Sequence, residues 1–162
     1  MKNSTSNNPI TIRKSNQEDL SEMLLLFKDT ITAVCKEDYN TDQLEAWKSG
    51  SENTKRWLNV MEEQYILIAE SENKIVGFCT LDQGNYIDLL FVHKDYQHQG
   101  IASQLYHLIE EKALEQDQKL LTAEVSKTAK PFFERMNFKV ILEQTVHVKG
   151  IDIINYKMEK YL

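Results

Sequence analysis

The sequence lacks long hydrophobic runs and is poor in glycine, proline and cysteine. No apolar run exceeds five residues, whereas a transmembrane helix needs about 18 or more. Five glycines and two prolines in 162 residues exclude collagen-like and low-complexity chains. Cys35 and Cys79 form no C-x-x-C pattern, so we interpret both as small apolar core residues of a protein in a reducing compartment.

What is present fits one globular domain. Apolar residues make up 41% of the chain and charged residues 27%, and a chain of this length buries a substantial core. Residues 1–9 (MKNSTSNNP) are polar and hold no apolar stretch for a signal sequence. We therefore expect a disordered tail over residues 1–9, a single domain over residues 10–162, and a cytoplasmic location.

The charge balance is acidic, with 25 acidic against 19 basic residues and a net charge of −6. An acidic surface repels phosphate backbones and anionic lipids, so we expect no nucleic-acid and no membrane partner. The same charge favours cationic partners such as amines. The four histidines have no metal-ligand spacing, and we expect no metal site.

Apolar periodicity and turn residues divide the chain into alternating strands and helices. We expect strands at residues 10–13, 65–69, 74–81, 86–92, 120–125, 138–148 and 151–158. We expect helices at residues 17–34, 41–50, 53–61, 100–117 and 129–136. Runs of strands broken by single helices predict an α/β protein with a mixed α+β sheet.

The segment from Tyr86 to Ser103 (YIDLLFVHKDYQHQGIAS) carries most of the functional information. A buried strand enters a polar loop, and a helix begins at the glycine. The first N–H groups of a helix lack intrahelical partners and bind anions such as phosphate. Gly100 allows close approach to the backbone, and Gln97, His98 and Gln99 offer side-chain donors. The segment therefore predicts a phosphate-binding loop.

The loop does not match the common nucleotide-binding motifs. A triphosphate loop needs a second glycine and a following lysine, and a dinucleotide loop needs G-x-G-x-x-G. A nucleotide-phosphate enzyme is therefore the weakest of the alternatives. Residues 97–102 instead read Q-x-x-G-x-A.

This hexapeptide resembles the [QR]-x-x-G-x-[GA] signature of the GNAT superfamily of N-acetyltransferases. The preceding Leu90-Phe91-Val92 and the downstream TAKPFFERMNF are also similar to that family. The resemblance implies a twisted, mostly antiparallel sheet of about seven strands, flanked by helices and splayed at a central cofactor site. It also allows a homodimer.

The resemblance further implies acetyl-CoA as cosubstrate. Pantetheine would lie along Leu90, Phe91 and Val92, hydrogen-bonding the strand as an added strand does. Ser126 stands where the family commonly has a cofactor-contacting Asn. Phe133 replaces the Tyr that protonates the leaving thiolate, and it would pack beside pantetheine instead. The implied pyrophosphate contacts are Gln97, His98, Gln99, Gly100, Ile101, Ala102 and Ser103.

Two residues are candidates for the proton-transfer chemistry. Asp88 is the only charge inside the apolar strand and, if the strand is regular, shares the face of Leu90 and Val92. It would serve as the general base, or else cap a turn or pair with a nearby lysine. Tyr39, clustered with Glu37 and Asp38 in the loop that would face the acceptor, is the second candidate. Tyr39, Ser126 or Tyr156 would replace the missing acid.

These observations predict direct acetyl transfer from acetyl-CoA to a primary amine, with a small molecule favoured as acceptor. A protein N-terminus or lysine is the alternative acceptor. A non-catalytic acyl-CoA-binding module is the alternative from another class, and Phe133 favours it.

Overall fold

The computed structural model describes residues 8–162, so most of the tail expected at residues 1–9 lies outside the described residues. The strands and helices follow the expected order. The strands are β1 (Thr11–Lys14), β2 (Tyr65–Ser71), β3 (Lys74–Asp82), β4 (Tyr86–Val92), β5 (Leu120–Ser126), β6 (Lys139–Val148) and β7 (Ile151–Tyr161). The α-helices are α1 (Leu20–Val34), α2 (Thr41–Lys48), α3 (Thr54–Glu63), α4 (Ile101–Glu115) and α5 (Lys130–Arg135), with 3-10 turns η1 (Gln17–Asp19), η2 (Ser49–Glu52) and η3 (Lys94–Tyr96).

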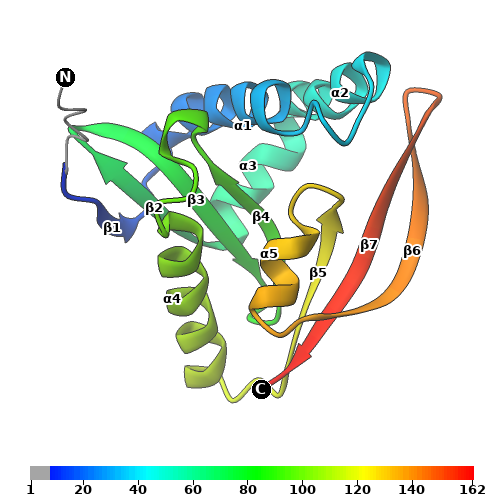
Figure 1. Cartoon of the computed structure of the whole chain (residues 1–162). Coiled ribbons are helices and arrows are strands. Elements are labelled where there is room, and N and C mark those ends of the chain that lie inside the picture. Colours follow the sequence, from blue (N-terminus) through cyan, green and yellow to red (C-terminus); the bar gives the residue numbers. More distant parts are fainter. Residues whose placement is uncertain (1–7) are drawn as a thin grey trace, which may run out of the picture.

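The strands form one seven-stranded sheet in the order β1-β2-β3-β4-β5-β7-β6. Every neighbouring pair is antiparallel except β4 and β5, which are parallel. This arrangement confirms the predicted fold class. The parallel pair is the centre of the sheet, and the helix α4 between its two strands is their crossover (Figure 1).

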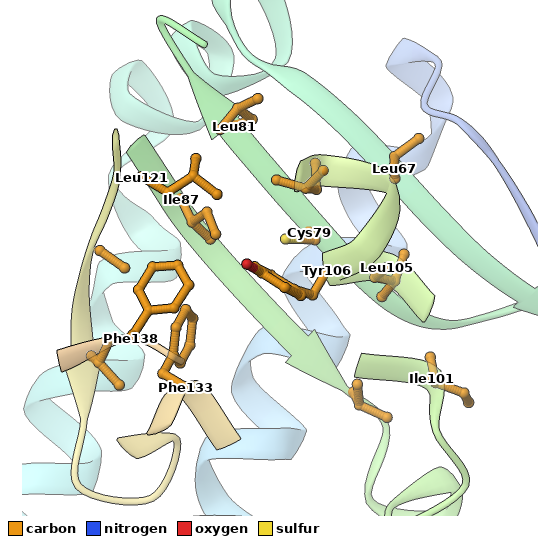
Figure 2. Close-up of a cluster of buried hydrophobic side chains, with 14 of the residues drawn as sticks. Leu67, Cys79, Leu81, Ile87, Ile101, Leu105, Tyr106, Leu121, Phe133 and Phe138 are labelled. Carbon is orange, nitrogen blue, oxygen red and sulfur yellow. The ribbon is translucent and has the colours of Figure 1, made fainter. Parts of the chain in front are cut away.

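Helices cover both faces of the sheet (Figure 1). On one face, α4 and α5 pack on a core centred on Tyr106, whose side chain is fully buried near Cys79, Phe133 and Phe138 (Figure 2). On the other face, α1 and α3 pack on alternate residues of β2, β3 and β4. Leu89 and Phe91 of β4 belong to this second core.

A third, smaller core joins the end of α1 and the helix α2 to the β6–β7 hairpin. Its buried members are Cys35, Tyr39, Ala46 and Ile153. This core lies on the same side as α1 but contacts the other half of the sheet. The region from α1 to α2 therefore spans the sheet from β4 to β7.

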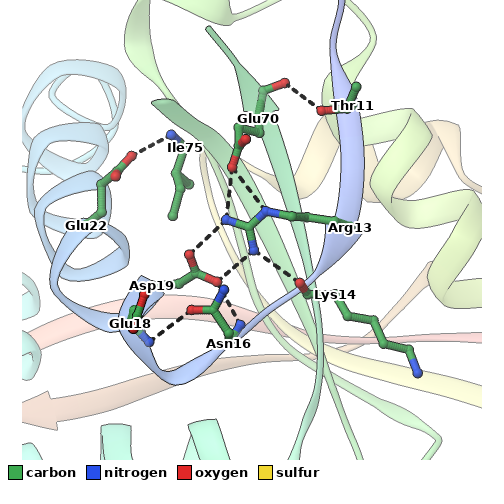
Figure 3. Close-up of polar contacts among 9 residues, drawn as sticks. All are labelled: Thr11, Arg13, Lys14, Asn16, Glu18, Asp19, Glu22, Glu70 and Ile75. Carbon is green, nitrogen blue, oxygen red and sulfur yellow. Dashed lines mark hydrogen bonds and ion pairs between the residues drawn. The ribbon is translucent and has the colours of Figure 1, made fainter. Parts of the chain in front are cut away.

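The first strand and first helix are fastened to β2 by one arginine (Figure 3). Arg13 donates to both carboxylate oxygens of Asp19 at 2.9 and 2.8 Å and to Glu70 at 2.9 and 3.0 Å. Asn16 caps η1, which precedes α1 where the sequence predicted one continuous helix. The arginine thus fixes how the chain turns from β1 into the helix that covers the second core.

Element boundaries otherwise differ little from the sequence expectations. β7 continues to Tyr161, beyond the expected end at residue 158, because its residues 155–161 pair with the whole of β5. Within the β2–β3 turn, Glu72 and Asn73 both have positive φ angles of 52° and 61°, the backbone of a tight hairpin turn.

Candidate active site

The centre of the sheet opens between its two parallel strands. β4 and β5 pair only at Tyr86 with Thr122 and at Ile87 with Ala123. Beyond these pairs β5 continues to Ser126 beside β7, while β4 continues to Val92 beside β3. The two strands therefore part in the direction of their carboxyl ends, which places a gap at the end of a β-α-β unit.

The gap exposes main-chain groups of β4. The His93 N–H donates to the Val76 carbonyl at 2.8 Å, so alternation along the strand directs the polar groups of Phe91 toward β3 and those of Leu90 and Val92 away from it. β5 has left the ladder at this height, so the Leu90 N–H and C=O and the Val92 N–H face the gap. They form the edge that an extended ligand joins as an added strand.

The helix α4 begins at the end of this edge. Gly100 adopts the left-handed conformation (φ 80°) and provides no side-chain cap. The first intrahelical donor is Gln104, whose N–H bonds to the Gly100 carbonyl at 3.0 Å. The N–H groups of Ile101, Ala102 and Ser103 therefore precede the helical ladder and carry the positive end of the helix dipole.

The backbone conformation of Gly100 favours glycine. A Cβ atom at this position would meet no atom within 4 Å, so a side chain there would be unhindered by neighbours but strained at positive φ. The residue is exposed and directly precedes the free amides. Among the predicted contacts, the Ile101 side chain is buried in the α4 core, which leaves only its N–H for a ligand.

The glutamine that opens the motif holds the loop in place. Gln97 Nε2 donates to the Val92 carbonyl at 2.6 Å, and the loop therefore folds back on the strand end. The side-chain amide of Gln97 is thus engaged within the loop, and its predicted contact with the pyrophosphate stays a prediction. His98 and Gln99 are exposed, and His98 has a positive φ of 59°.

Asp88 lies at a β-bulge in β4. Thr80 pairs with Leu89 and Leu81 with Ile87, which leaves Asp88 without a partner on β3. The expectation that Asp88 shares the face of Leu90 and Val92 assumed a regular strand and is wrong. The bulge instead turns its carboxylate toward α3 on the opposite face.

Two residues of the α3 region bind the Asp88 carboxylate, and no sequence motif predicts either of them. Arg56 donates to its two oxygens at 3.1 and 3.0 Å, and Gln64 Nε2 donates at 2.8 Å. The Asp88 side chain is 9% exposed and that of Arg56 is 44% exposed. The carboxylate is thus a buried charge with a solvent-facing counter-ion. Its partner is an arginine, Arg56, where the sequence offered a lysine as the alternative to a catalytic role.

Tyr39 links the loop between α1 and α2 to the far side of the gap. Its hydroxyl donates to the Ile154 carbonyl at 2.7 Å and accepts from the Lys127 N–H at 2.9 Å. Burial raises the pKa of this phenol to about 12. Both hydrogen-bonding directions of the hydroxyl are therefore occupied by main-chain groups of β7 and of the turn after β5.

Two further contacts run in parallel with that of Tyr39. Thr128 Oγ1 donates to Asp38 at 2.7 Å, and Gln43 Nε2 donates to the Asp152 carbonyl at 2.9 Å. Residues 38–43 therefore form a strap that crosses the gap on the α1 side, from the helix above β4 to β7. No local sequence motif indicates this strap, because each of its residues bonds to a partner more than 85 positions away in the chain.

Ser126 and Phe133, which differ from the family pattern, both make contacts that support the fold. Ser126 Oγ accepts from the Ala129 N–H at 3.1 Å and so shapes the turn into α5. Phe133 is 4% exposed, and its ring packs against Phe132 and Phe138 at centroid distances of 5.5 and 5.1 Å. Phe133 supplies an apolar wall and no proton donor.

The two thiols are removed from solvent. Cys35 is 4% exposed and Cys79 fully buried, and burial raises the pKa of both. Over residues 8–162, no three His, Cys, Asp or Glu side chains come together as a potential metal site. No helix in that part of the chain is both long and apolar enough to span a bilayer.

Comparison with known proteins agrees with this geometry. Residues 35–160 match the family model described as the acetyltransferase (GNAT) domain. The chain is 32% identical over 151 residues to YafP of Escherichia coli K12, named an uncharacterized N-acetyltransferase, and the match covers 93% of this chain and 95% of YafP.

Solved structures share the whole fold. A GCN5-related N-acetyltransferase from Rhodopseudomonas palustris superimposes with a TM-score of 0.90 at 28% identity, covering 94% of this chain and 95% of that one. The PaiA N-acetyltransferase of Thermoplasma acidophilum, solved in complex with coenzyme A, has a TM-score of 0.75 at 21% identity, covering 95% of this chain and 99% of that one. Family match, relative and fold agree, and the chain belongs to the GNAT superfamily as an acetyl-CoA-dependent N-acetyltransferase.

Proposed function

We propose that this enzyme transfers the acetyl group directly from acetyl-CoA to a primary amine of a small molecule. The observation that carries the proposal is the pairing of two sets of main-chain groups near the gap: the N–H and C=O of Leu90 with the N–H of Val92, and the first amides of α4. Pantetheine takes the outward groups of β4, and the pyrophosphate takes the N–H groups of residues 101–103. The thioester then lies in the gap near the Asp88 bulge.

Direct transfer is supported by the state of the two cysteines. A covalent acetyl-enzyme needs a nucleophile that reaches the thioester, and a thiolate at neutral pH is the usual form. Burial of Cys35 and Cys79 disfavours their thiolates. The amine itself is therefore the nucleophile, and the N–H groups facing the gap polarise the thioester carbonyl.

Proton transfer follows from the groups around the bulge. A protonated primary amine must lose a proton before it attacks, and Asp88 is the carboxylate beside the opening of β4 from β5. We assign it the base role, directly or through one water, with Arg56 and Gln64 holding its orientation. A coenzyme thiol has a pKa near that of cysteine, about 8.5, so the thiolate leaves without a dedicated acid at Phe133.

The strap over residues 38–43 favours a small acceptor. It covers the α1 side of the gap and is fastened to β7 and to the turn after β5 by Tyr39, Gln43 and Asp38. An extended protein chain would have to lie across this cover, whereas a small amine needs less room at the gap. Protein N-termini and lysines are for this reason the second choice.

A thiol-release assay with acetyl-CoA and a panel of amines tests the proposal. The panel contains alkylamines, diamines, amino sugars, amino acids and a peptide with a free N-terminus. We expect CoA release with at least one small amine and a product acetylated on nitrogen. Tight acetyl-CoA binding without release for any amine would instead support the non-catalytic acyl-CoA-binding module, and activity on the peptide alone would support the protein acceptor.

A further inference from the structure

One buried polar atom beside the gap has no partner within residues 8–162. Asn155 Oδ1, on β7, is inaccessible to solvent and accepts no hydrogen bond. Buried amide oxygens in native proteins are nearly always satisfied, and an exception calls for a ligand or a bound water. The Asn155 side chain as a whole is only partly buried, and the terminal torsion of an asparagine is soft, so a small rotation presents the oxygen to a bound molecule.

The register of the sheet places Asn155 beside the open part of the gap. Asn155 pairs with Ser126 of β5, three residues beyond Ala123, the last residue of β5 that pairs with β4. Its neighbour Ile154 carries the carbonyl that accepts the Tyr39 hydroxyl. Asn155 thus lies where the strap meets β7.

The alternation of β7 gives the face on which Asn155 lies. Tyr156 and Met158 pack into the core under α4 and α5, whereas Ile153 belongs to the small core under α2. Because side chains two apart share a face, Asn155 lies with Ile153 on the strap side. This face of the sheet is opposite to the α4 core, and it is the face on which we propose that the amine binds.

We propose that Asn155 is a specificity-determining residue whose Oδ1 accepts a hydrogen bond from an N–H or O–H group of the acceptor. The inference rests on the proposed function and deepens it. Because Oδ1 can only accept a hydrogen bond, it selects an amine that carries a hydrogen-bond donor in addition to the reacting nitrogen, such as a second amino group or a hydroxyl. The preferred substrate class is therefore a small polyfunctional amine.

The test compares Asn155→Leu with the wild type on matched amines, for example 1,4-diaminobutane against n-butylamine. We expect Asn155→Leu to raise KM for the polyfunctional amine about 10-fold, the size of one lost hydrogen bond, with kcat and the KM for acetyl-CoA nearly unchanged. The preference for the polyfunctional member of each pair falls by the same factor. Asn155→Asp keeps an acceptor oxygen and retains the preference.

Thermal unfolding supplies a readout that needs no substrate. Replacing an unsatisfied buried amide by an apolar side chain of similar size should raise Tm by about 2–4 °C, whereas loss of a structural hydrogen bond would lower it. Asn59→Leu, on the exposed face of α3, is the matched control and should change neither KM nor Tm by a comparable amount.

The outcomes separate the two proposals. If the wild type turns over amines and Asn155→Leu has the same KM and the same preference for the polyfunctional amine, the role of Asn155 is overturned and the acetyl transfer stands. If Asn155→Leu lowers Tm and reduces kcat/KM equally for both amines of each matched pair, Asn155 has a structural role instead. No turnover of any amine by the wild type would overturn the proposed function, and the role of Asn155 with it.

Discussion

The catalytic proposal depends, at the scale of single residues, on how Asp88 is held. Its carboxylate is nearly buried and accepts three hydrogen bonds from Arg56 and Gln64. An ion pair of this kind is equally suited to a structural role. The two roles differ in what happens when each partner is removed.

We expect Asp88→Asn to lower kcat about 100-fold near neutral pH, since general-base catalysis contributes roughly that much. The defect should shrink at high pH, where the amine loses its proton without help. Arg56→Gln leaves the carboxylate and its bond to Gln64 in place, and should retain most of the rate. Steady-state pH profiles of both variants measure this, and equal, pH-independent losses in the two would show that Asp88 serves only the ion pair.

We infer that Tyr39 is a positioning residue. Its hydroxyl satisfies one carbonyl and one N–H of the main chain, and Tyr39→Phe would leave both without a partner in a buried place. We expect the free energy of unfolding to fall by about 1–3 kcal/mol, measured by chemical denaturation. The limiting rate at saturating amine should persist with an unchanged pH profile, and the disappearance of a group titrating above neutral pH from that profile would instead identify Tyr39 as an acid.

The elements that form the site were largely predictable from the sequence. The strand, loop and helix of residues 86–115 follow from apolar pattern and from one glycine at a helix start. The bulge at Asp88 was not predictable, because it depends on how β3 and β4 pair and leaves no mark on the apolar alternation of β4. For the same reason the sequence assigned Asp88 to the wrong face and missed Arg56.

The strap and the role of Asn155 depend on contacts between distant elements. Tyr39 is a sequence candidate because its loop would face the acceptor. Its hydroxyl bonds to main-chain groups of Ile154 and Lys127, which any residue at those positions could supply. Asn155 occupies an ordinary position in a predicted strand. Only the sheet order, with β7 inserted between β5 and β6, brings these residues to the gap.

The junction of β1, η1 and β2 provides a pH-dependent test at the scale of elements. Hydrogen bonds from Arg13 hold the pKa of Asp19 below its usual value. A carboxylate with a lowered pKa stabilises the folded state above the pKa of the unfolded chain, and this contribution is lost as the pH falls through the folded pKa. The network is part of the support for α1 (Figure 3).

We expect Asp19→Asn to reduce the free energy of unfolding at pH 7 by about 1–2 kcal/mol, since Arg13 is partly exposed and solvent screens the pair. The difference from the wild type should narrow as the pH falls below about 4. Urea unfolding at several pH values measures it. Asp29→Asn, on the exposed side of α1, is the control, and a difference that persists undiminished in acid would contradict the ion-pair account.

At the scale of the whole molecule, the sheet consists of two halves that meet at the foot of β4 and β5. They are joined by the two residue pairs at Tyr86 and Ile87, by the crossover helix α4 and by the strap of residues 38–43. We propose that the coenzyme binds along β4 on one side of this junction and that the strap covers the amine on the other. A homodimer, which the family resemblance allowed, stays a prediction.

The central claim is that the first amides of α4 bind the coenzyme's diphosphate, and calorimetric titration of CoA into two glycine variants tests it most directly. Gly100 and Gly150 both have positive φ angles, 80° and 77°, and a Cβ at either would meet no atom within 4 Å. Gly100→Glu and Gly150→Glu therefore introduce the same backbone strain and the same charge, one beside the α4 amides and one in the β6–β7 turn. We expect Gly100→Glu to weaken CoA binding at least 100-fold, about 2.7 kcal/mol, and Gly150→Glu to bind CoA as the wild type does. Unchanged CoA affinity in a folded Gly100→Glu variant would contradict the claim.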